Sequence, residues 1–280
     1  MNQVNPFSGT PFDLTGKTAI ITGGCGLLGT EFAKAIVSAG ASVVIGDINN
    51  DHLSKTKKEI NELYKDSNIS ALHLDVTNSQ SIIDFIAQIK KEHGKVDILV
   101  NSAAIDPKFE KDSTISEFTS FEKFPLTAWN KSLEVNLTGV FQITQAVCDV
   151  MDKAGKGSII NIGSNYGLVG PDQRIYKRDS ETKQPYKPVV YSVCKAALIG
   201  FTKYLATYYA GTKIRVNMRT PAGILNNHDD EFIKKYSTRT ILGRMSEKEE
   251  YCGSILFLAS DASSYMTGAN LIIDGGWTTL

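Results

Sequence analysis

The sequence predicts an α/β protein built on a doubly wound, mainly parallel seven-stranded sheet with helices on both faces. Runs rich in Val and Ile alternate with longer segments of helical period along the chain. These runs are apolar almost throughout, as strands buried on both faces are. A glycine-rich turn follows the first run and leads into a helix. Sheets of this kind bind ligands beyond the carboxyl ends of their strands, where the strand order reverses.

Seven short apolar runs are the expected strands. In chain order they are Thr18–Thr22, Ser42–Gly46, Ile69–Leu74, Val96–Val100, Ser158–Ile162, Ile214–Asn217 and Leu271–Ile273. The segments between them carry apolar residues at helical spacing, which predicts helices at Leu27–Ala39, Asp51–Tyr64, 79–93, 127–151, 191–209 and 246–259. Each predicted helix separates two strands, so each connection crosses one face of the sheet.

The whole chain, residues 1–280, is expected to form a single domain. Its length and its 42% hydrophobic content suffice for one large core. Residues 1–13 are a polar N-terminal extension. Two insertions, 106–126 and 167–188, follow predicted strands and should project over the active site, while 222–245 is the expected substrate-loop region.

The charge and the cysteine pattern exclude several classes of partner. Thirty basic residues balance thirty acidic ones, so no long-range field favours nucleic acid or an anionic membrane. The scattered cysteines, the lack of a secretory leader and the absence of eighteen consecutive apolar residues predict a cytoplasmic protein with reduced thiols. The four histidines show no metal-ligand spacing, so no metal site is expected.

The glycine-rich turn Thr22–Gly29 has the features of a dinucleotide site. Its glycines allow a tight turn, a close approach of the backbone to a pyrophosphate and close packing of helix on strand, and the helix N-terminus offers free N–H groups to phosphates. Asp47 ends the second strand, where a carboxylate accepts a hydrogen bond from a ribose hydroxyl. The alternative is that Asp47 opens a helix turn. Because no Arg or Lys stands in the turn or just after Asp47 to meet a 2′-phosphate, NAD is preferred over NADP.

Tyr191 and Lys195 lie four residues apart in a predicted helix and therefore on one face of it. A phenol with its ordinary pKa of about 10 needs a shift of roughly three units, or about 4 kcal/mol, to act at pH 7. A cation about 4 Å away at an effective dielectric near 20 supplies roughly that energy. The pair is thus a candidate acid–base centre, although the same spacing also marks solvated helix faces.

From Leu14 to Trp277 the chain resembles the short-chain dehydrogenase/reductase family, which implies a Rossmann-type sheet. The matching motifs are the glycines Gly23, Gly26 and Gly29, the adenine-side Asp75, the element Asn101-Ser102-Ala103-Ala104, the catalytic Asn136, Ser164, Tyr191 and Lys195, and the closing Tyr265–Gly268 and Asp274–Gly276. Several independent motifs in the family's order are far more specific than any one of them.

The resemblance implies hydride transfer between a nicotinamide ring and a carbinol or carbonyl carbon. Tyr191 is expected to exchange the proton with the substrate oxygen, and Lys195 to lower the pKa of the phenol and bond the nicotinamide ribose. Ser164 is expected to donate to the substrate oxygen and Asn136 to hold a water that links Lys195 to solvent. The structural alternatives are a strand-end turn former for Ser164, a buried helix amide for Asn136 and a surface lysine for Lys195.

The expected cofactor contacts follow the glycine turn and the neighbouring strand ends. They are Gly23, Cys25, Gly26, Leu27, Leu28, Asp47, Ile48, Asp75, Val76, Asn101, Ser102, Ala103, Tyr191, Lys195, Pro221, Gly223 and Ile224. Cys25 lies inside the turn, and we interpret it as a small buried thiol rather than a redox switch.

Three departures from the family pattern bear on function. Leu27 stands where single-domain members more often have glycine, and Ala222 follows Pro221 where the family has Pro-Gly, with Arg219 shortly before. The spacing from Ser164 to Tyr191 is long, which predicts an unusual lid over the substrate pocket.

Residues 171–188 carry Arg, Lys and Tyr that could receive a phosphate, a carboxylate or a sugar; the alternative is a solvated loop. The motifs are most similar to oxidoreductases of surface-sugar and flagellin modification, so a small sugar or sugar phosphate is the expected substrate. A 3-oxoacyl or generic secondary alcohol, or a non-catalytic NAD sensor, are the alternatives. The resemblance also implies a homodimer or homotetramer built through the helices at 127–151 and 191–209.

Overall fold

The computed structural model describes residues 5–65, 67–106 and 120–279. Its centre is a seven-stranded, all-parallel sheet with the order β3-β2-β1-β4-β5-β6-β7. The strands are β1 Thr18–Thr22, β2 Ser42–Asp47, β3 Ile69–His73, β4 Ile98–Asn101, β5 Lys156–Ile162, β6 Lys213–Pro221 and β7 Asn270–Ile273. The predicted fold class is confirmed, and every predicted strand overlaps an observed one.

Helices connect the strands. The α-helices are α1 Leu27–Ser38, α2 Asn50–Leu63, α3 Ser79–His93, α5 Leu126–Leu133, α6 Val140–Ala154, α7 Val189–Tyr208, α8 Asp230–Ser237 and α9 Cys252–Ala259. Shorter turns are η1 Phe121–Lys123, the π-helical η2 Glu134–Gly139, η3 Asn165–Gly167, η4 Gln173–Tyr176, η5 Lys248–Tyr251, η6 Asp261–Ser263 and η7 Trp277–Thr279.

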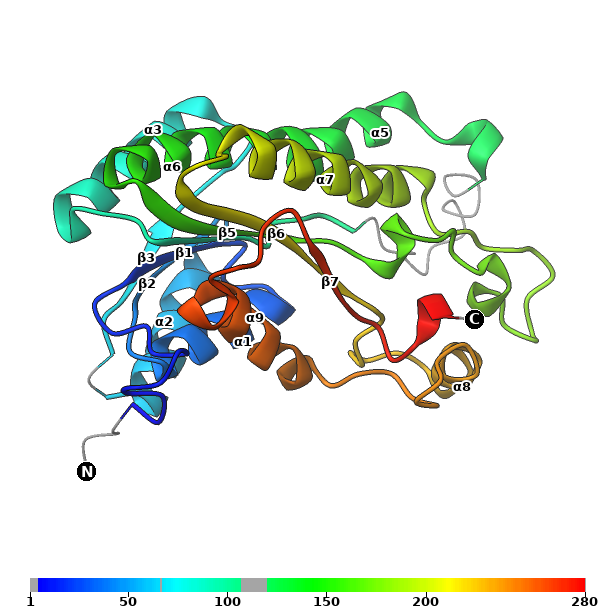
Figure 1. The fold of residues 1–280 in the computed structure, drawn as a ribbon. Coiled ribbons are helices and arrows are strands. Elements are labelled where there is room, and N and C mark those ends of the chain that lie inside the picture. The colour runs from blue at the N-terminus through cyan, green and yellow to red at the C-terminus, as the bar shows by residue number, and fades with distance from the viewer. Residues whose placement is uncertain (1–4, 66, 107–119, 280) are drawn as a thin grey trace.

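The helices form two layers around the sheet (Figure 1): α1, α2 and α9 cover one face, and α3, α6 and α7 cover the other. Neighbouring strand residues face opposite layers, since Ile21 packs in the first layer's core and Ile20 in the second's. This explains why the strands are apolar at consecutive positions.

The strand order reverses at β1, which pairs with β2 on one side and β4 on the other. Thr22 and Asn101 stand side by side at the carboxyl ends of β1 and β4. Ligands of doubly wound sheets bind at this kind of switch point.

Two predicted helices differ from the structure in their regularity. The helix expected at 127–151 is α5 and α6 joined by the π-helical turn η2, which contains the buried Asn136. Single π turns inside α-helices occur frequently at functional sites. The helix expected at 246–259 begins as the 3₁₀ turn η5 and becomes α9 at Cys252.

The structure adds one helix, α8, within the substrate-loop region 222–245. The Asp229 carboxylate caps it by accepting from the Phe232 backbone N–H at 2.9 Å. Phe232 and Tyr236, one turn apart, are its buried side chains. An eight-residue helix offers too few periodic positions to stand out in the sequence.

The predicted insertion 167–188 packs against α8 and is not a simple solvated loop. Ile175 is buried, and the Tyr176 ring lies 5.6 Å from that of Phe232. Arg178 donates to the Asp229 carboxylate at 2.6 Å, and Lys235 of α8 pairs with Asp179 at 2.9 Å. We call 167–188 together with α8 the cover. The other predicted insertion, 106–126, lies largely outside the described residues.

Helix α7 is long and apolar enough, by length and composition alone, to cross a membrane, and is the one such helix among the described residues. Core helices pass the same test. Its inner residues Val190, Cys194 and Leu198 are buried, and the helix lies along the sheet beside α6 (Figure 1).

Arg219 on β6 is a fully buried cation without a carboxylate partner among the described residues. Its Nε donates to Ser254 Oγ at 3.2 Å and its guanidinium lies 3.7 Å from the centroid of the Tyr251 ring. Both terminal nitrogens lack a hydrogen-bond partner within the described chain. Burial lowers the pKa of Arg219 to about 9. The charge therefore opposes folding at neutral pH.

We expect Arg219→Met to raise the free energy of unfolding by about 1–2 kcal/mol at pH 7, because an apolar side chain of similar length removes the unpaired charge. Urea unfolding at pH 7 measures this difference.

Arg215, on the same strand, is the matched control. Its guanidinium donates to the carbonyls of Leu258 at 2.9 Å and Ser260 at 3.1 Å. Arg215→Met should lower stability by about 1–3 kcal/mol, since it removes the hydrogen bonds that the guanidinium donates to those two carbonyls. A loss of stability in Arg219→Met as large as in Arg215→Met would contradict the account.

Candidate active site

The glycine turn between β1 and α1 fits a nucleotide pyrophosphate. Gly23 has φ +62°, and a Cβ there would lie 2.7 Å from Ala103 Cα. A Cβ on Gly29 would collide with the Gly23 carbonyl oxygen, and one on Gly24 would lie 2.5 Å from Ile45 Cβ. Only glycines allow this turn to pack against both β2 and the segment after β4, and to bring the α1 N-terminus close to a phosphate.

Asp47 turns its carboxylate toward this turn. It accepts from the Cys25 backbone N–H at 3.1 Å and from that of Asn49 at 3.1 Å. The cap of α2 is Asn49, whose side chain accepts from His52 N–H. Asp47 therefore fixes both the glycine turn and the chain that enters α2.

Cys25 is a partly buried free thiol. Burial, with a smaller contribution from the Asp47 carboxylate, raises its pKa to about 11. A thiol that stays protonated at neutral pH is a poor redox switch, which agrees with the interpretation from sequence.

The strand-end residues predicted to line the cofactor divide into two groups. Thr22 Oγ1 accepts from the backbone N–H groups of Ser102 and Ala103, each at 3.1 Å, which fixes the segment after β4 at the switch point. Asp75 accepts from the Thr77 hydroxyl and N–H, and these bonds hold its pKa below the ordinary value.

The other group has side chains directed into the core. The Asn101 amide donates to Thr144 Oγ1 and to Asn161 Oδ1, both at 2.8 Å, and ties β4 to β5 and α6. Val76 is buried against Gly139. Ile48, by contrast, is largely exposed. The Asn101 Oδ1 is buried without a hydrogen-bond partner among the described residues.

The loop after β6 is held by aromatic and backbone contacts. Gly223 N–H donates to the Tyr236 hydroxyl of α8, and a Cβ on Gly223 would collide with that ring. Ile224 forms an isolated parallel bridge with Ser246. The segment Pro221–Ile224 is thus anchored to the cover at the edge of the site.

Three of the four predicted catalytic side chains converge at the carboxyl ends of β5 and β6. Lys195 Nζ lies 5.9 Å from the centroid of the Tyr191 ring and donates to the Ile162 carbonyl at 2.8 Å. Burial lowers the pKa of Lys195 to about 8. Burial and the Asp106 carboxylate raise the pKa of Tyr191, while a hydrogen bond with Ser164 lowers it. The phenol is therefore a weak acid in this state, and only added positive charge would ionise it near neutral pH.

The Asn136 side chain binds the backbone of the chain after β4. Its side-chain amide accepts from the Ile105 N–H at 2.8 Å and donates to the Ile105 carbonyl at 2.9 Å. Those two bonds occupy the amide and fix the chain after β4. A water held by Asn136 would have to use its backbone carbonyl.

A second lysine lies over the tyrosine. Lys187 Nζ is 4.3 Å from the centroid of the Tyr191 ring and pairs with both carboxylate oxygens of Asp106, one at 2.7 Å. The two partners are 81 positions apart, so no local pattern in the sequence could have indicated this pair.

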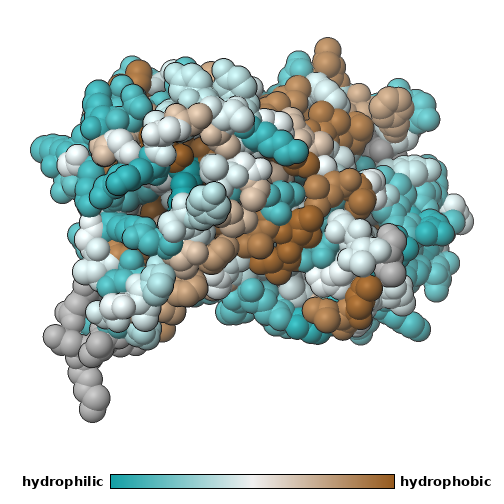
Figure 2. Space-filling model, in the orientation of Figure 1, coloured by the Kyte–Doolittle hydropathy of each residue, from teal (hydrophilic) through white to brown (hydrophobic). Residues whose placement is uncertain are grey.

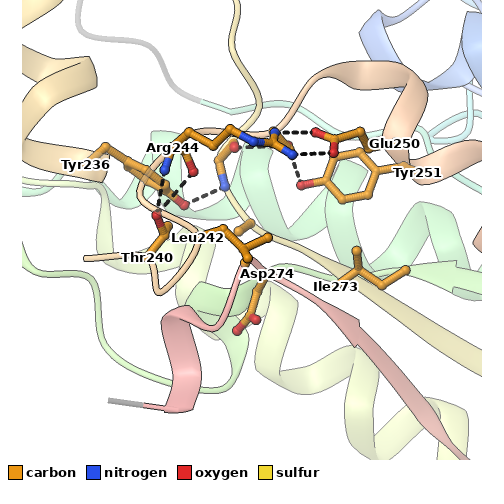
Figure 3. A pocket seen from close by; sticks show the side chains of 12 residues that line it. Tyr236, Thr240, Leu242, Arg244, Glu250, Tyr251, Ile273 and Asp274 are labelled. Carbon is orange, nitrogen blue, oxygen red and sulfur yellow. Dashed lines mark hydrogen bonds and ion pairs between the residues drawn. The ribbon is translucent and has the colours of Figure 1, made fainter. Parts of the chain in front are cut away.

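Figure 3 shows a small pocket beside the loop after β6. The Arg244 guanidinium pairs with Glu250 at 2.6 Å on one side, and Tyr236, Thr240 and Asp274 line the rest. At about 60 Å³ it accommodates a few waters but neither a nicotinamide ring nor a sugar. Among the described residues, no group of three or more His, Cys, Asp or Glu side chains could hold a metal.

Comparison with known proteins agrees with this geometry. A family profile described as enoyl-(acyl carrier protein) reductase matches residues 27–278. The NAD-dependent glycerol dehydrogenase of Listeria innocua is 33% identical over 275 residues, covering 95% of this chain and 96% of the relative. The post-translational flagellin modification protein A of Campylobacter coli is 32% identical over 265 residues, covering 94% and 99%.

Among solved structures, a gluconate 5-dehydrogenase from Burkholderia cenocepacia in complex with NADP and tartrate superposes with a TM-score of 0.81 at 28% identity, covering 96% of this chain and 98% of that one. Matches of this length, together with the parallel sheet and the glycine turn, lead to one conclusion: the chain belongs to the short-chain dehydrogenase/reductase family and is an oxidoreductase of that type.

Proposed function

We propose that the protein interconverts a secondary alcohol and a ketone on a sugar or polyol, with NAD as the preferred cofactor. The observation that carries the proposal is the convergence of Tyr191, Lys195 and Ser164 at the strand ends beside a turn shaped for a dinucleotide. The bound nicotinamide supplies the hydride chemistry.

The residues of the chain supply proton transfer and orientation. Tyr191 exchanges a proton with the substrate oxygen, and Ser164 donates to the same oxygen as charge develops on it. Lys195, held by the Ile162 carbonyl, places an ammonium beside the phenol and lowers its pKa when the cofactor's positive charge is added. Asn136 fixes Ile105 and thereby shapes the wall of the site.

The preference for NAD is supported by Asp47 at the end of β2. Its carboxylate faces the glycine turn, where a 2′-phosphate would meet a like charge. The residues that follow it, Ile48 and Asn49, carry no positive charge.

The substrate proposal is a sugar-like molecule of surface-polysaccharide or flagellin modification. The relatives that act on glycerol and gluconate, and the flagellin modification protein, support it. A 3-oxoacyl substrate is the second candidate, favoured by a 3-oxoacyl-(acyl-carrier-protein) reductase of Thermotoga maritima that is 33% identical over 267 residues.

We also propose a cytoplasmic homo-oligomer. Figure 2 shows apolar side chains gathered over the edge strand β7, where Ile272 is exposed. Tyr204 and Tyr208 on α7 and Phe141 on α6 are exposed as well. Apolar surface of this extent on two sides supports assembly through more than one interface.

The proposal predicts that purified protein reduces NAD with a sugar or polyol and that NAD is favoured over NADP by about a hundredfold in kcat/KM. Absorbance of the reduced nicotinamide measures both quantities. Asp47→Asn should lower the preference about tenfold, because the repelling charge is gone.

Asp51→Asn, which removes an exposed carboxylate in the first turn of α2, should leave the preference unchanged. If the protein turns over 3-oxoacyl thioesters but no sugar or polyol, the proposed substrate class is wrong and the second candidate takes its place. Binding of NAD without turnover of any alcohol or ketone would overturn the catalytic one.

A further inference from the structure

The ion pair between Asp106 and Lys187 lies beside Tyr191. Lys187 Nζ contacts the ring of Tyr191, the proposed proton donor, at 4.3 Å from its centroid. The lysine side chain is 11% exposed and the aspartate side chain 44%, so the pair has one buried and one solvent-facing member. A substrate whose oxygen meets Tyr191 would therefore have these two groups as neighbours.

Both members of the pair are held in position from behind. The Asn136 amide binds Ile105, the residue before Asp106, through two hydrogen bonds. The Lys187 backbone N–H donates to Gln173 Oε1 at 2.8 Å, and Gln184 donates to the Gln173 carbonyl at 2.6 Å. The pair is therefore part of a built wall rather than a chance contact between two surface side chains.

The charges of this wall cancel. A phosphate or carboxylate group placed beside the pair is attracted by Lys187 and repelled by Asp106 at similar distances, so Coulomb's law gives little net gain. Two other cations of the cover are paired in the same way, Arg174 with Asp172 and Arg178 with Asp229. A hydroxyl group, which both donates and accepts, suits either member of the pair.

We propose that Asp106 and Lys187 bind two neighbouring hydroxyl groups of an uncharged polyol or sugar, and so select against phosphorylated and acidic substrates. One hydroxyl donates to the Asp106 carboxylate and its neighbour accepts from the Lys187 ammonium; both are charge-assisted hydrogen bonds. This inference rests on the proposed function, because it requires the reacting carbon to lie at Tyr191. It narrows the sugar or sugar-phosphate class to its uncharged members.

The test measures binding and turnover separately. Calorimetry of the protein with NADH compares glycerol, ribitol and sorbitol with glycerol 3-phosphate and gluconate. Wild type should bind at least one uncharged polyol about tenfold more tightly than either anion. Lys187→Met and Asp106→Asn should each weaken polyol binding about tenfold, and Asp106→Asn should improve the relative binding of the anions, because Lys187 is then unopposed.

Lys235→Met is the matched control, since Lys235 is a paired lysine of the same cover that does not contact Tyr191. Lys235→Met should leave polyol binding unchanged. A loss of polyol affinity as large as in Lys187→Met would mean that any broken ion pair of the cover weakens binding. If an anion binds more tightly than every uncharged polyol, the inference is overturned, whereas the proposed oxidoreductase reaction is not affected. Polyol binding with the expected selectivity but no NAD reduction supports the inference and overturns the proposed reaction.

Discussion

Tyr191→Phe is expected to lower kcat by about 10⁴-fold, at the upper end of what a positioned proton donor contributes. The substitution removes one oxygen and leaves the ring in place under Lys187, so packing and cofactor binding should persist. Steady-state rates of NAD reduction and the Kd for NADH measure the two effects. The Kd should change by less than about twofold.

Tyr176→Phe is the matched control for that variant. Tyr176 is another largely buried tyrosine of the same site region, and its hydroxyl lies 3.0 Å from that of Tyr166. Its loss should affect rates only slightly, because it does not face Lys195. Activity of Tyr191→Phe near that of wild type would remove Tyr191 from proton transfer.

Lys195→Met is expected to lower kcat/KM by about 10³-fold, since roughly 4 kcal/mol of phenol activation is lost with the ammonium. Binding of NADH should weaken as well, because the same ammonium is proposed to bond the nicotinamide ribose. Rates and calorimetry measure these effects, and thermal unfolding checks the fold, because the Ile162 carbonyl loses its donor.

Lys203→Met, on the exposed side of the same helix, should change neither quantity. A Lys195→Met variant that retains turnover but loses stability would assign this lysine a structural role only.

The central strands β1, β2, β4, β5 and β6 could be predicted from the sequence because they are short apolar runs that are largely buried on both faces. Thr18–Thr22 is found with the predicted bounds, and β6 extends beyond Ile214–Asn217 because Met218, Arg219 and Thr220 are also buried there. The burial of Arg219 could not be predicted from the sequence, because an unpaired arginine inside a core is rare.

The glycine turn and the Tyr191–Lys195 pair were also predictable, because both are local. The glycine turn depends on residues that are neighbours in the sequence, and residues four apart in a helix always lie on one face of it. The side-chain partners of Asn101 and Asn136 could not be predicted, because they lie far along the chain: Thr144 and Asn161 for Asn101, and Ile105 for Asn136.

The contact between Asp106 and Lys187 depends on tertiary structure alone. The aspartate follows β4 and the lysine precedes α7, and the cover brings them together over Tyr191. Helix α8 also depends on tertiary structure, because Phe232 on its buried face packs against Tyr176 of the insertion 167–188.

The pKa of Tyr191 tests most directly whether Lys195 tunes the phenol for proton transfer. NMR of protein labelled at the tyrosine Cζ carbon measures this pKa without cofactor and with NAD⁺. Burial and Asp106 raise this pKa in the free protein, and we expect it to fall by several units when NAD⁺ is bound to wild type. In Lys195→Met the fall should be much smaller. An equal fall in both proteins, or none in wild type, would contradict the claim that the lysine tunes the phenol for proton transfer.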